Sequence, residues 1–266
     1  MVTPQFITED ASDRSVSTSW KDFKSPKLRQ ISQPSNRIEW LEYLGSGEDG
    51  IVFKVRFGQE QPVAMKIFWL TQRPKPDIVP GGRTLRRYWA FEKECINLAI
   101  IEKIEAAMQK AEADPNQEIV LTIPTSRQDA IRNLRAFSDE ARLSPIRPQK
   151  SLCPPTFPNI TACFGWTKIK RRDIPRLRPP VWNDVDDDVD WHWAIIYEFV
   201  PPMEQDLKIG QAHLDFFYLT GFSLEPFSME AFLEMLQTGL GLRVASGQKE
   251  SMIYFEGDFF NRGFCP

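Results

Sequence analysis

The stretch YLGSGEDGIVFKV, residues 43–55, decides the fold because it places three glycines between two apolar runs. Gly45, Gly47 and Gly50, followed by Val52, satisfy the spacing G-x-G-x-x-G-x-V. The β-branched and aromatic residues on either side predict two strands joined by a turn, which we call the glycine turn (residues 45–50). A turn between two strands favours a flap over a nucleoside triphosphate, whereas a dinucleotide-binding turn opens a helix. Glycine suits such a flap because side chains would block the approach of backbone N–H groups to phosphate oxygens.

The next apolar run, QPVAMKIFWL (residues 61–70), predicts a third strand. It contains VAMK, residues 63–66, which resembles the V-A-I-K pattern of protein kinases with Met65 in place of isoleucine. The resemblance implies that Lys66 contacts the α- and β-phosphates of ATP, and that Val52 and Ala64 also belong to the nucleotide site. A lysine among apolar neighbours needs a partner for its charge.

A long helix is predicted over residues 88–113, because apolar side chains recur there at helical spacing. It carries Glu94, within FEKECINL, and an acid at this place can reach back to Lys66 as the αC glutamate of protein kinases does. Glu92 is the alternative partner. A second helix is predicted over residues 125–143, with Ser126 as its N-cap.

Two more strands are predicted over ITACFGWTKI (160–169) and WHWAIIYEFV (191–200). The second runs into AIIYEFVPP (194–202), which resembles the hinge of protein kinases. The resemblance implies that Tyr197 is the gatekeeper and that Glu198 and Val200 contact the adenine edge. The order of glycine turn, lysine strand, helix and hinge predicts an α+β, protein-kinase-like fold with a five-stranded antiparallel N-lobe sheet and an αC helix.

Longer phrases resemble one family in particular. They are FEKEC (91–95), LRAFSDEAR (134–142), CFGWTKI (163–169), AIIYEFVP (194–201) and LDFFYLTGF (214–222). In this order they resemble the fungal protein-kinase-like family of Fta-type inner-kinetochore subunits, from about residue 37 to residue 222. The resemblance implies a nuclear, kinetochore location and kinetochore components as protein partners. In that family the segment after the LDFF helix leads to a strand with an acidic residue analogous to the D-F-G aspartate, and the residues after 222 show no such strand.

Phosphoryl transfer needs further residues. Protein kinases use H-R-D-x-x-x-x-N to orient the nucleophile and D-F-G to hold magnesium. Asp215 follows His213 in QAHLDFFYL, but no asparagine stands at the required distance. Asp258 begins the triplet DFF, with Phe260 where the motif has glycine. Both are candidate catalytic acids within incomplete motifs, so the sequence puts magnesium binding in doubt and leaves ATP binding open.

The sequence therefore favours a pseudokinase, an inactive protein-kinase-like protein that serves as an interaction or scaffold module. The alternative is an active ATP-dependent protein kinase or phosphotransferase that uses Asp215 or Asp258. Three regions are predicted: a flexible tail over residues 1–36, a kinase-like N-lobe with insertions over 37–200, and a shortened, divergent and mostly helical C-lobe remnant over 201–266.

Composition argues against other classes of function. A net charge of −3 and a pI near 5.6 provide no overall basic field for nucleic acid. A basic run over residues 168–178 is followed by an acidic run over 184–190 that would cancel its field, so direct nucleic-acid binding is not expected. The four cysteines lack the paired spacing of a zinc site. Because no signal peptide and no stretch of roughly 18 apolar residues is found, an intracellular protein without a membrane span is expected.

Overall fold

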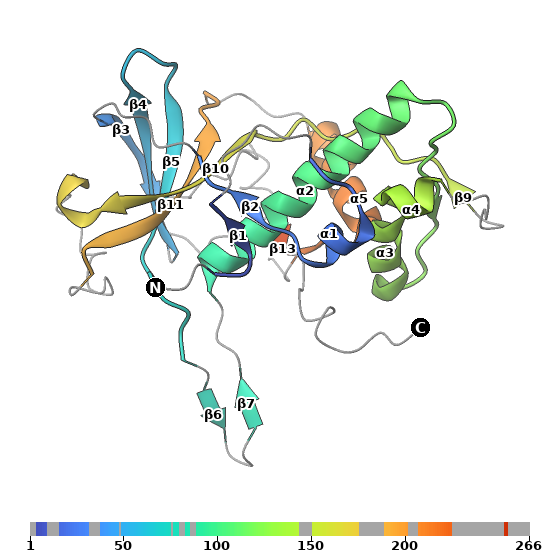
Figure 1. The fold of residues 1–266 in the computed structure, drawn as a ribbon, viewed down its shortest axis with the longest axis horizontal. Helices are drawn as coiled ribbons and strands as arrows, with labels where there is room; N and C mark the ends of the chain where they lie inside the picture. The colour runs from blue at the N-terminus through green and yellow to red at the C-terminus, as the bar shows by residue number, and fades with distance from the viewer. Residues whose placement is uncertain are drawn as a thin grey trace.

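The computed structural model has an α+β fold in which one long helix lies against a five-stranded sheet (Figure 1). The residues that the structure describes are 4–9, 16–31, 38–47, 49–75, 77–79, 83–85, 89–143, 151–175, 189–201, 207–224 and 253–254. Asp258 and the acidic run over 184–188 therefore lie outside the described residues, as does most of the predicted C-lobe remnant.

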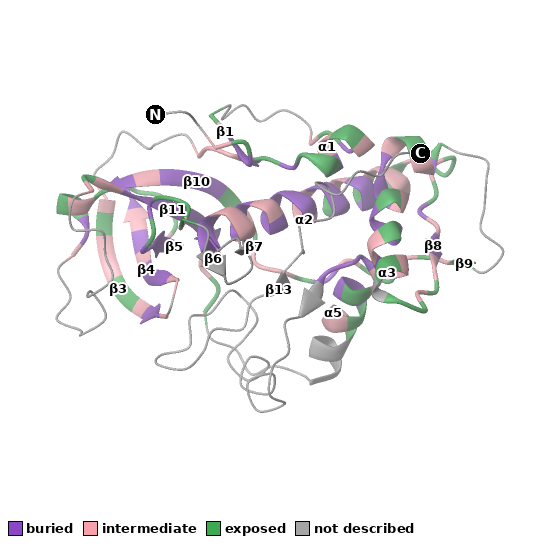
Figure 2. Cartoon of the chain, turned by 90° about the horizontal axis from the view of Figure 1, so that it is seen from below, coloured by how far each residue is buried: buried purple, intermediate pink, exposed green. Residues whose placement is uncertain are grey.

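The sheet consists of five antiparallel strands, as the sequence predicted. They are β3 (Ile38–Ser46), β4 (Gly50–Phe57), β5 (Val63–Phe68), β10 (Cys163–Lys170) and β11 (Trp191–Glu198). Across the sheet they follow the order β10-β11-β5-β4-β3. The first three strands form a meander, and β11 then pairs with the edge of β5 that the meander leaves free. Figure 2 shows that β11 is almost wholly buried, whereas the edge strand β3 consists of intermediate and exposed residues until its last two positions, Gly45 and Ser46, which are buried.

The long helix is α2 (Ala90–Ala113), and it begins two residues later than predicted. Trp89 at its N-cap has extended backbone angles, φ −125° and ψ 104°, and its side chain makes no capping hydrogen bond. The first half of α2 lies against the sheet, and its second half lies among the remaining helices (Figure 1). The helix therefore belongs to two hydrophobic clusters at once.

The predicted helix over residues 125–143 is divided. α3 (Arg127–Asn133) is followed by a 3₁₀ turn (Leu134–Phe137) and then by α4 (Asp139–Arg142). The break falls at Ser138, where φ is −75° and ψ is 153°, and the Ser138 side chain accepts a hydrogen bond from the Ala141 N–H. A serine that caps a new helix favours ending the preceding one at that position. The spacing of apolar residues alone does not predict this break. Ser126 caps α3 as expected.

α5 (Leu207–Leu219) lies beside the second half of α2 (Figure 1). The described elements also include three short antiparallel pairs: β6 (Asp77–Val79) with β7 (Arg83–Leu85), β8 (Leu121–Thr122) with β9 (Ser151–Leu152), and β12 (Ser223–Leu224) with β13 (Ile253–Tyr254). β13 lies beside α2, in a part of the sequence that shows no strand pattern. Among the described helices, none is long and apolar enough to cross a membrane.

The first 36 residues differ from the predicted flexible tail in both of their described parts, 4–9 and 16–31. They form β1 (Ile7–Thr8), α1 (Trp20–Lys24) and β2 (Leu28–Arg29), which lie along α2 (Figure 1). The Phe23 side chain is fully buried, and Phe6 and Leu28 are almost so. The polar composition of this segment suggested too little burial to offset the entropy cost of ordering it. Of its described side chains, however, Phe6, Ile7, Phe23 and Leu28 are buried in the core.

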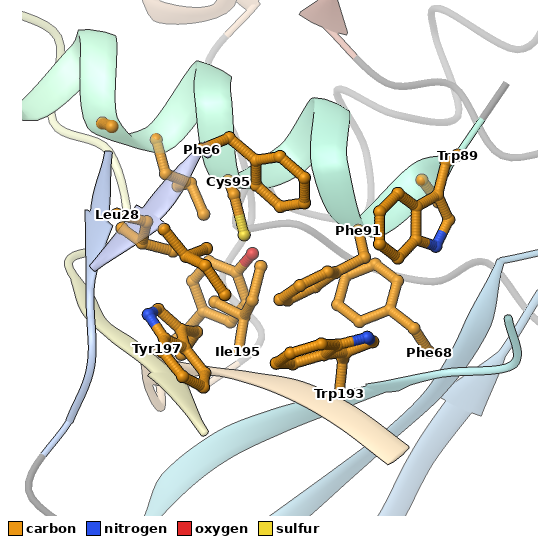
Figure 3. Packing of buried hydrophobic residues seen from close by; sticks show 14 residues of the cluster. Phe6, Leu28, Phe68, Trp89, Phe91, Cys95, Trp193, Ile195 and Tyr197 are labelled. Atoms are coloured by element: carbon orange, nitrogen blue, oxygen red, sulfur yellow. The ribbon is translucent and has the colours of Figure 1, made fainter. Parts of the chain in front are cut away.

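Within the described residues, buried apolar side chains form three clusters. The first lies between α2 and one face of the sheet, the second joins α2 to the other helices, and the third lies on the opposite face of the sheet. In the first cluster Phe91 of α2 stacks on Trp193 of β11, with ring centroids 4.7 Å apart and ring planes 12° from parallel (Figure 3). Phe6 meets Trp89 edge to face with centroids 5.5 Å apart. These contacts fix the position of α2 on the sheet.

Candidate functional site

Lys66 and Glu94 meet between the sheet and α2. Lys66 lies on β5 and Glu94 on the second turn of α2, and the Lys66 Nζ donates a hydrogen bond to Glu94 Oε2 over 2.7 Å. Each side chain is only 3% exposed. This is the pairing that the sequence predicted. The alternative acid, Glu92, instead accepts from the guanidinium of Arg73 near the surface.

Tyr197 completes a group that we call the buried triad: Lys66, Glu94 and Tyr197. The Tyr197 hydroxyl donates to the other carboxylate oxygen of Glu94, Oε1. Burial, and after it the nearby charge of Glu94, raises the pKa of Tyr197 well above its usual value, so the phenol keeps its proton and stays a donor. Both oxygens of the Glu94 carboxylate are therefore hydrogen-bonded. The Lys66 Nζ also lies 5.1 Å from the centre of the Phe68 ring, which favours a cation.

Two thiols, of the buried Cys95 and the partly buried Cys163, show how apolar the surroundings of the triad are. Cys95 follows Glu94 on α2, and Cys163 faces Tyr197 across the β10–β11 register. Desolvation by burial raises the pKa of Cys163 to about 12 and raises that of Cys95 well above its usual value. Figure 3 shows the Cys95 sulfur directed into the first cluster, near Tyr197 and Ile195.

The strand register places most of the predicted cofactor-binding residues on the face of the sheet that α2 covers. Residues paired across antiparallel strands project to the same face. Gly45 pairs with Val52 and Val52 pairs with Lys66, so these three positions share a face. Ala64 pairs with Tyr197 on that same face. This agrees with the positions expected for a nucleotide site, but their contact with a nucleotide stays a prediction.

The predicted hinge lies at the end of β11. The Glu198 side chain is exposed, and its backbone N–H donates to the carbonyl of Ala162 over 2.9 Å. Val200 is 46% exposed. Phe199 lies between these two residues, and the centre of its ring is 4.0 Å from the Nζ of Lys54, a residue of β4. The structure thus brings Lys54, which no sequence pattern singles out, to the segment predicted to contact adenine.

The glycine turn is described at every position except 48. The Gly47 N–H donates to the Gly50 carbonyl over 2.9 Å. The Gly47 carbonyl accepts from the Trp69 indole Nε1 over 2.9 Å, and the Asp49 carbonyl accepts from the Trp69 backbone N–H over 3.0 Å. Sequence reasoning missed Trp69, because nothing in the pattern of residues shows that the chain after β5 returns to the turn.

Gly50 has a structural reason for lacking a side chain. A Cβ atom at this position would lie 2.2 Å from the Ile67 carbonyl oxygen of the neighbouring strand. Real Cβ atoms essentially never come so close to backbone, so the approach of β4 to β5 requires glycine here. The third glycine of the motif is therefore explained by strand packing, whatever the turn binds.

Asp215, a candidate catalytic acid, lies on the exposed side of α5. The neighbouring Phe216 and Phe217 are buried in the second cluster, and both Figures 1 and 2 show α5 apart from β5, the strand of Lys66. Partial burial lowers the pKa of His213 on the same helix. In the described part of the chain no group of three His, Cys, Asp or Glu side chains is placed to hold a metal ion.

Comparisons of the chain with protein-family models, with curated proteins and with solved structures give no match. The features that bear on its function are therefore the buried triad, the glycine turn and the strand order that positions them.

Proposed function

We propose that this chain is a protein-kinase-like pseudokinase that works as an interaction or scaffold module and does not transfer phosphate. The observation that carries the kinase-like part of the proposal is the burial of Lys66 with Glu94. In protein kinases a lysine on the third N-lobe strand pairs with a glutamate of the helix that follows it, and this pair is needed for activity. Here the pair joins β5 and α2 at the corresponding places in the chain order.

The order of the other elements supports the kinase-like part of the proposal. The glycine turn separates β3 from β4, the lysine strand comes next, the helix with the glutamate follows it, and β11 returns beside the lysine strand before the hinge-like segment. The glycine turn, the lysine strand, the helix and the hinge-like segment each agree with the same kinase-like order of elements. Agreement of several independent local patterns with one fold supports that fold more than any single motif does.

Two observations support inactivity. The Gly47 N–H bonds within the turn, although phosphate recognition would need it to point outward. Asp215 is exposed on a helix apart from the lysine strand, although phosphoryl transfer needs an acid beside the nucleophile. In this proposal the triad stabilises the packing of α2 on the sheet.

The family resemblance extends the proposal to partners and location. It supports inner-kinetochore proteins as partners and the nucleus as the place of action. Residual ATP binding without magnesium is compatible with an inactive module, whereas nucleic-acid contact forms no part of it.

The test is the thermal unfolding midpoint of the full chain with ATP, with and without magnesium, together with transfer of the γ-phosphate of ATP to the chain itself and to a mixed peptide library. We expect no transfer and no stabilisation that depends on magnesium. An active kinase would instead show magnesium-dependent stabilisation and transfer, both lost in Asp215→Ala or Asp258→Ala.

The scaffold part has its own test, which uses a variant without the ion pair. In Lys66→Met/Glu94→Gln both charges are removed while an acceptor for the Tyr197 hydroxyl stays in place. We expect this variant to keep wild-type affinity for reconstituted inner-kinetochore subcomplexes. Loss of that affinity in a folded double variant would show that the pair serves more than structure.

A further inference from the structure

Trp69 directly follows β5, and its side chain is buried on the face of the sheet opposite the triad. It is 5% exposed and belongs to the third cluster together with Met65 and Ile67 of β5. Lys66 and Phe68 project to the other face, because successive residues of a strand alternate. The indole therefore meets the glycine turn from the side away from Lys66.

Two hydrogen bonds join Trp69 to the glycine turn. The indole Nε1 donates to the Gly47 carbonyl over 2.9 Å, and the Trp69 backbone N–H donates to the Asp49 carbonyl over 3.0 Å. A third bond closes the turn on itself, from the Gly47 N–H to the Gly50 carbonyl over 2.9 Å. Polar groups of Gly47, Asp49 and Gly50 are thus bonded inside the protein.

A turn that binds phosphate has two requirements. Its backbone N–H groups must point toward the phosphate oxygens, and it must lie over the face from which the lysine projects. The bonds to Trp69 oppose both, since they tie two carbonyls of the turn to a residue whose side chain lies on the opposite face, in a conformation in which the Gly47 N–H bonds to Gly50.

We propose that Trp69 holds the glycine turn in a conformation that does not accept the phosphates of a nucleoside triphosphate, so that this one side chain lowers the affinity of the site for ATP. The inference rests on the proposed function in one respect, because it takes the turn to be a kinase-type phosphate flap. When a binding-competent conformation is a minor one, the observed affinity falls by its population. Loss of one neutral hydrogen bond should raise that population about three- to ten-fold.

The test compares Trp69→Phe with Trp89→Phe in the full chain. Trp69→Phe keeps a buried aromatic ring but removes the indole N–H. Trp89 is the matched control, because it is similarly buried and its Nε1 donates to a backbone carbonyl in the adjoining segment, that of Leu70 over 3.1 Å. Hydrogen exchange of the amides in residues 45–50 is measured without nucleotide. The affinity for a methylanthraniloyl derivative of ATP is then measured by fluorescence.

In Trp69→Phe we expect both the exchange of the turn amides and the affinity for the ATP derivative to be about three- to ten-fold higher than in wild type. In Trp89→Phe both quantities should stay within about two-fold of wild type. Unchanged exchange in Trp69→Phe overturns the proposal, because the turn is then not held by the indole. Faster exchange of the turn amides without a gain in affinity for the ATP derivative also overturns the proposal. The same holds if no variant binds the ATP derivative at all.

A different result would contradict the proposed function, namely transfer of phosphate by wild type in the presence of magnesium. That result would leave the comparison between Trp69→Phe and Trp89→Phe unaffected.

Discussion

The ammonium of Lys66 and the carboxylate of Glu94 form an ion pair that is almost fully enclosed, although 28 positions separate the two residues in the sequence. A buried pair of this kind gains little over apolar side chains of similar size, because both charges lose their hydration. Removing only one partner is far more damaging, because it strands the other charge in the core. The pair is therefore best understood as a constraint on where α2 can lie on the sheet.

Tyr197→Phe should destabilise the protein by about 1–3 kcal/mol, because it leaves Glu94 Oε1 buried without its donor. Urea denaturation followed by tryptophan fluorescence measures the effect. Tyr43→Phe is the control: its hydroxyl shares a hydrogen bond with Ser46, but the side chain is 43% exposed, so a change below about 0.5 kcal/mol is expected. Equal effects of the two substitutions would contradict a specific role for Tyr197.

Gly50→Ala should lower the free energy of unfolding by about 1–3 kcal/mol in the absence of any nucleotide. The new Cβ would collide with the Ile67 carbonyl and force β4 away from β5. Arg56→Ala on the same strand removes only a partly exposed ion pair with Glu39 and should change stability by less than about 0.5 kcal/mol. If Gly50→Ala is as stable as wild type, this glycine is not required by strand packing.

Stability should fall with rising pH above the ordinary thiol pKa of 9.0, in part through Cys163. Its folded pKa is about 12, so between pH 9 and 12 the folded state holds a proton that the unfolded state has lost. The free energy of unfolding then falls by up to about 1.4 kcal/mol per pH unit for this group. When denaturation is measured at pH 8, 9.5 and 10.5, the free energy of unfolding should fall less steeply with pH in Cys163→Ala than in wild type. The exposed Cys153 offers the comparison, since Cys153→Ala should retain the wild-type decline.

We expect the N-terminal segment around Thr18 to contribute to the stability of the folded core. The fully buried Thr18 hydroxyl donates to Asp139 over 2.8 Å and accepts from Lys110 over 2.8 Å and from Arg142 over 3.3 Å. Thr18→Val keeps the shape but removes these bonds, and about 1–3 kcal/mol of stability should be lost. Thr18→Ser keeps the hydroxyl and should lose clearly less. Indistinguishable variants would mean that the hydroxyl network does not secure this segment.

The local pattern of apolar residues was enough to predict the strands of the sheet and the long helix. It did not predict features that depend on contacts between segments distant in the sequence. Apolar and β-branched runs marked the strands that become β4, β5 and β11, and helical spacing marked α2 to within two residues. The pairing of Lys66 with Glu94 could be predicted because a charge inside an apolar strand needs a partner, and the kinase resemblance identified one.

Three features escaped prediction for physical reasons. Phe6, Phe23 and Leu28 are isolated in a polar segment, and only the surfaces of α2 and the sheet make their burial favourable. Ser138 breaks a helix that the apolar spacing would continue, because its side chain caps the next one. Trp69 reaches the glycine turn only once β4 and β5 are side by side, a relationship that no short stretch of sequence contains.

The unfolding free energies of wild type, Lys66→Met, Glu94→Gln and Lys66→Met/Glu94→Gln test most directly whether the buried pair is a structural element. We predict that Lys66→Met alone loses about 3–5 kcal/mol and that the double variant recovers at least half of this loss, because no stranded charge remains. Losses that simply add, with the double variant the least stable of the four, would contradict the account.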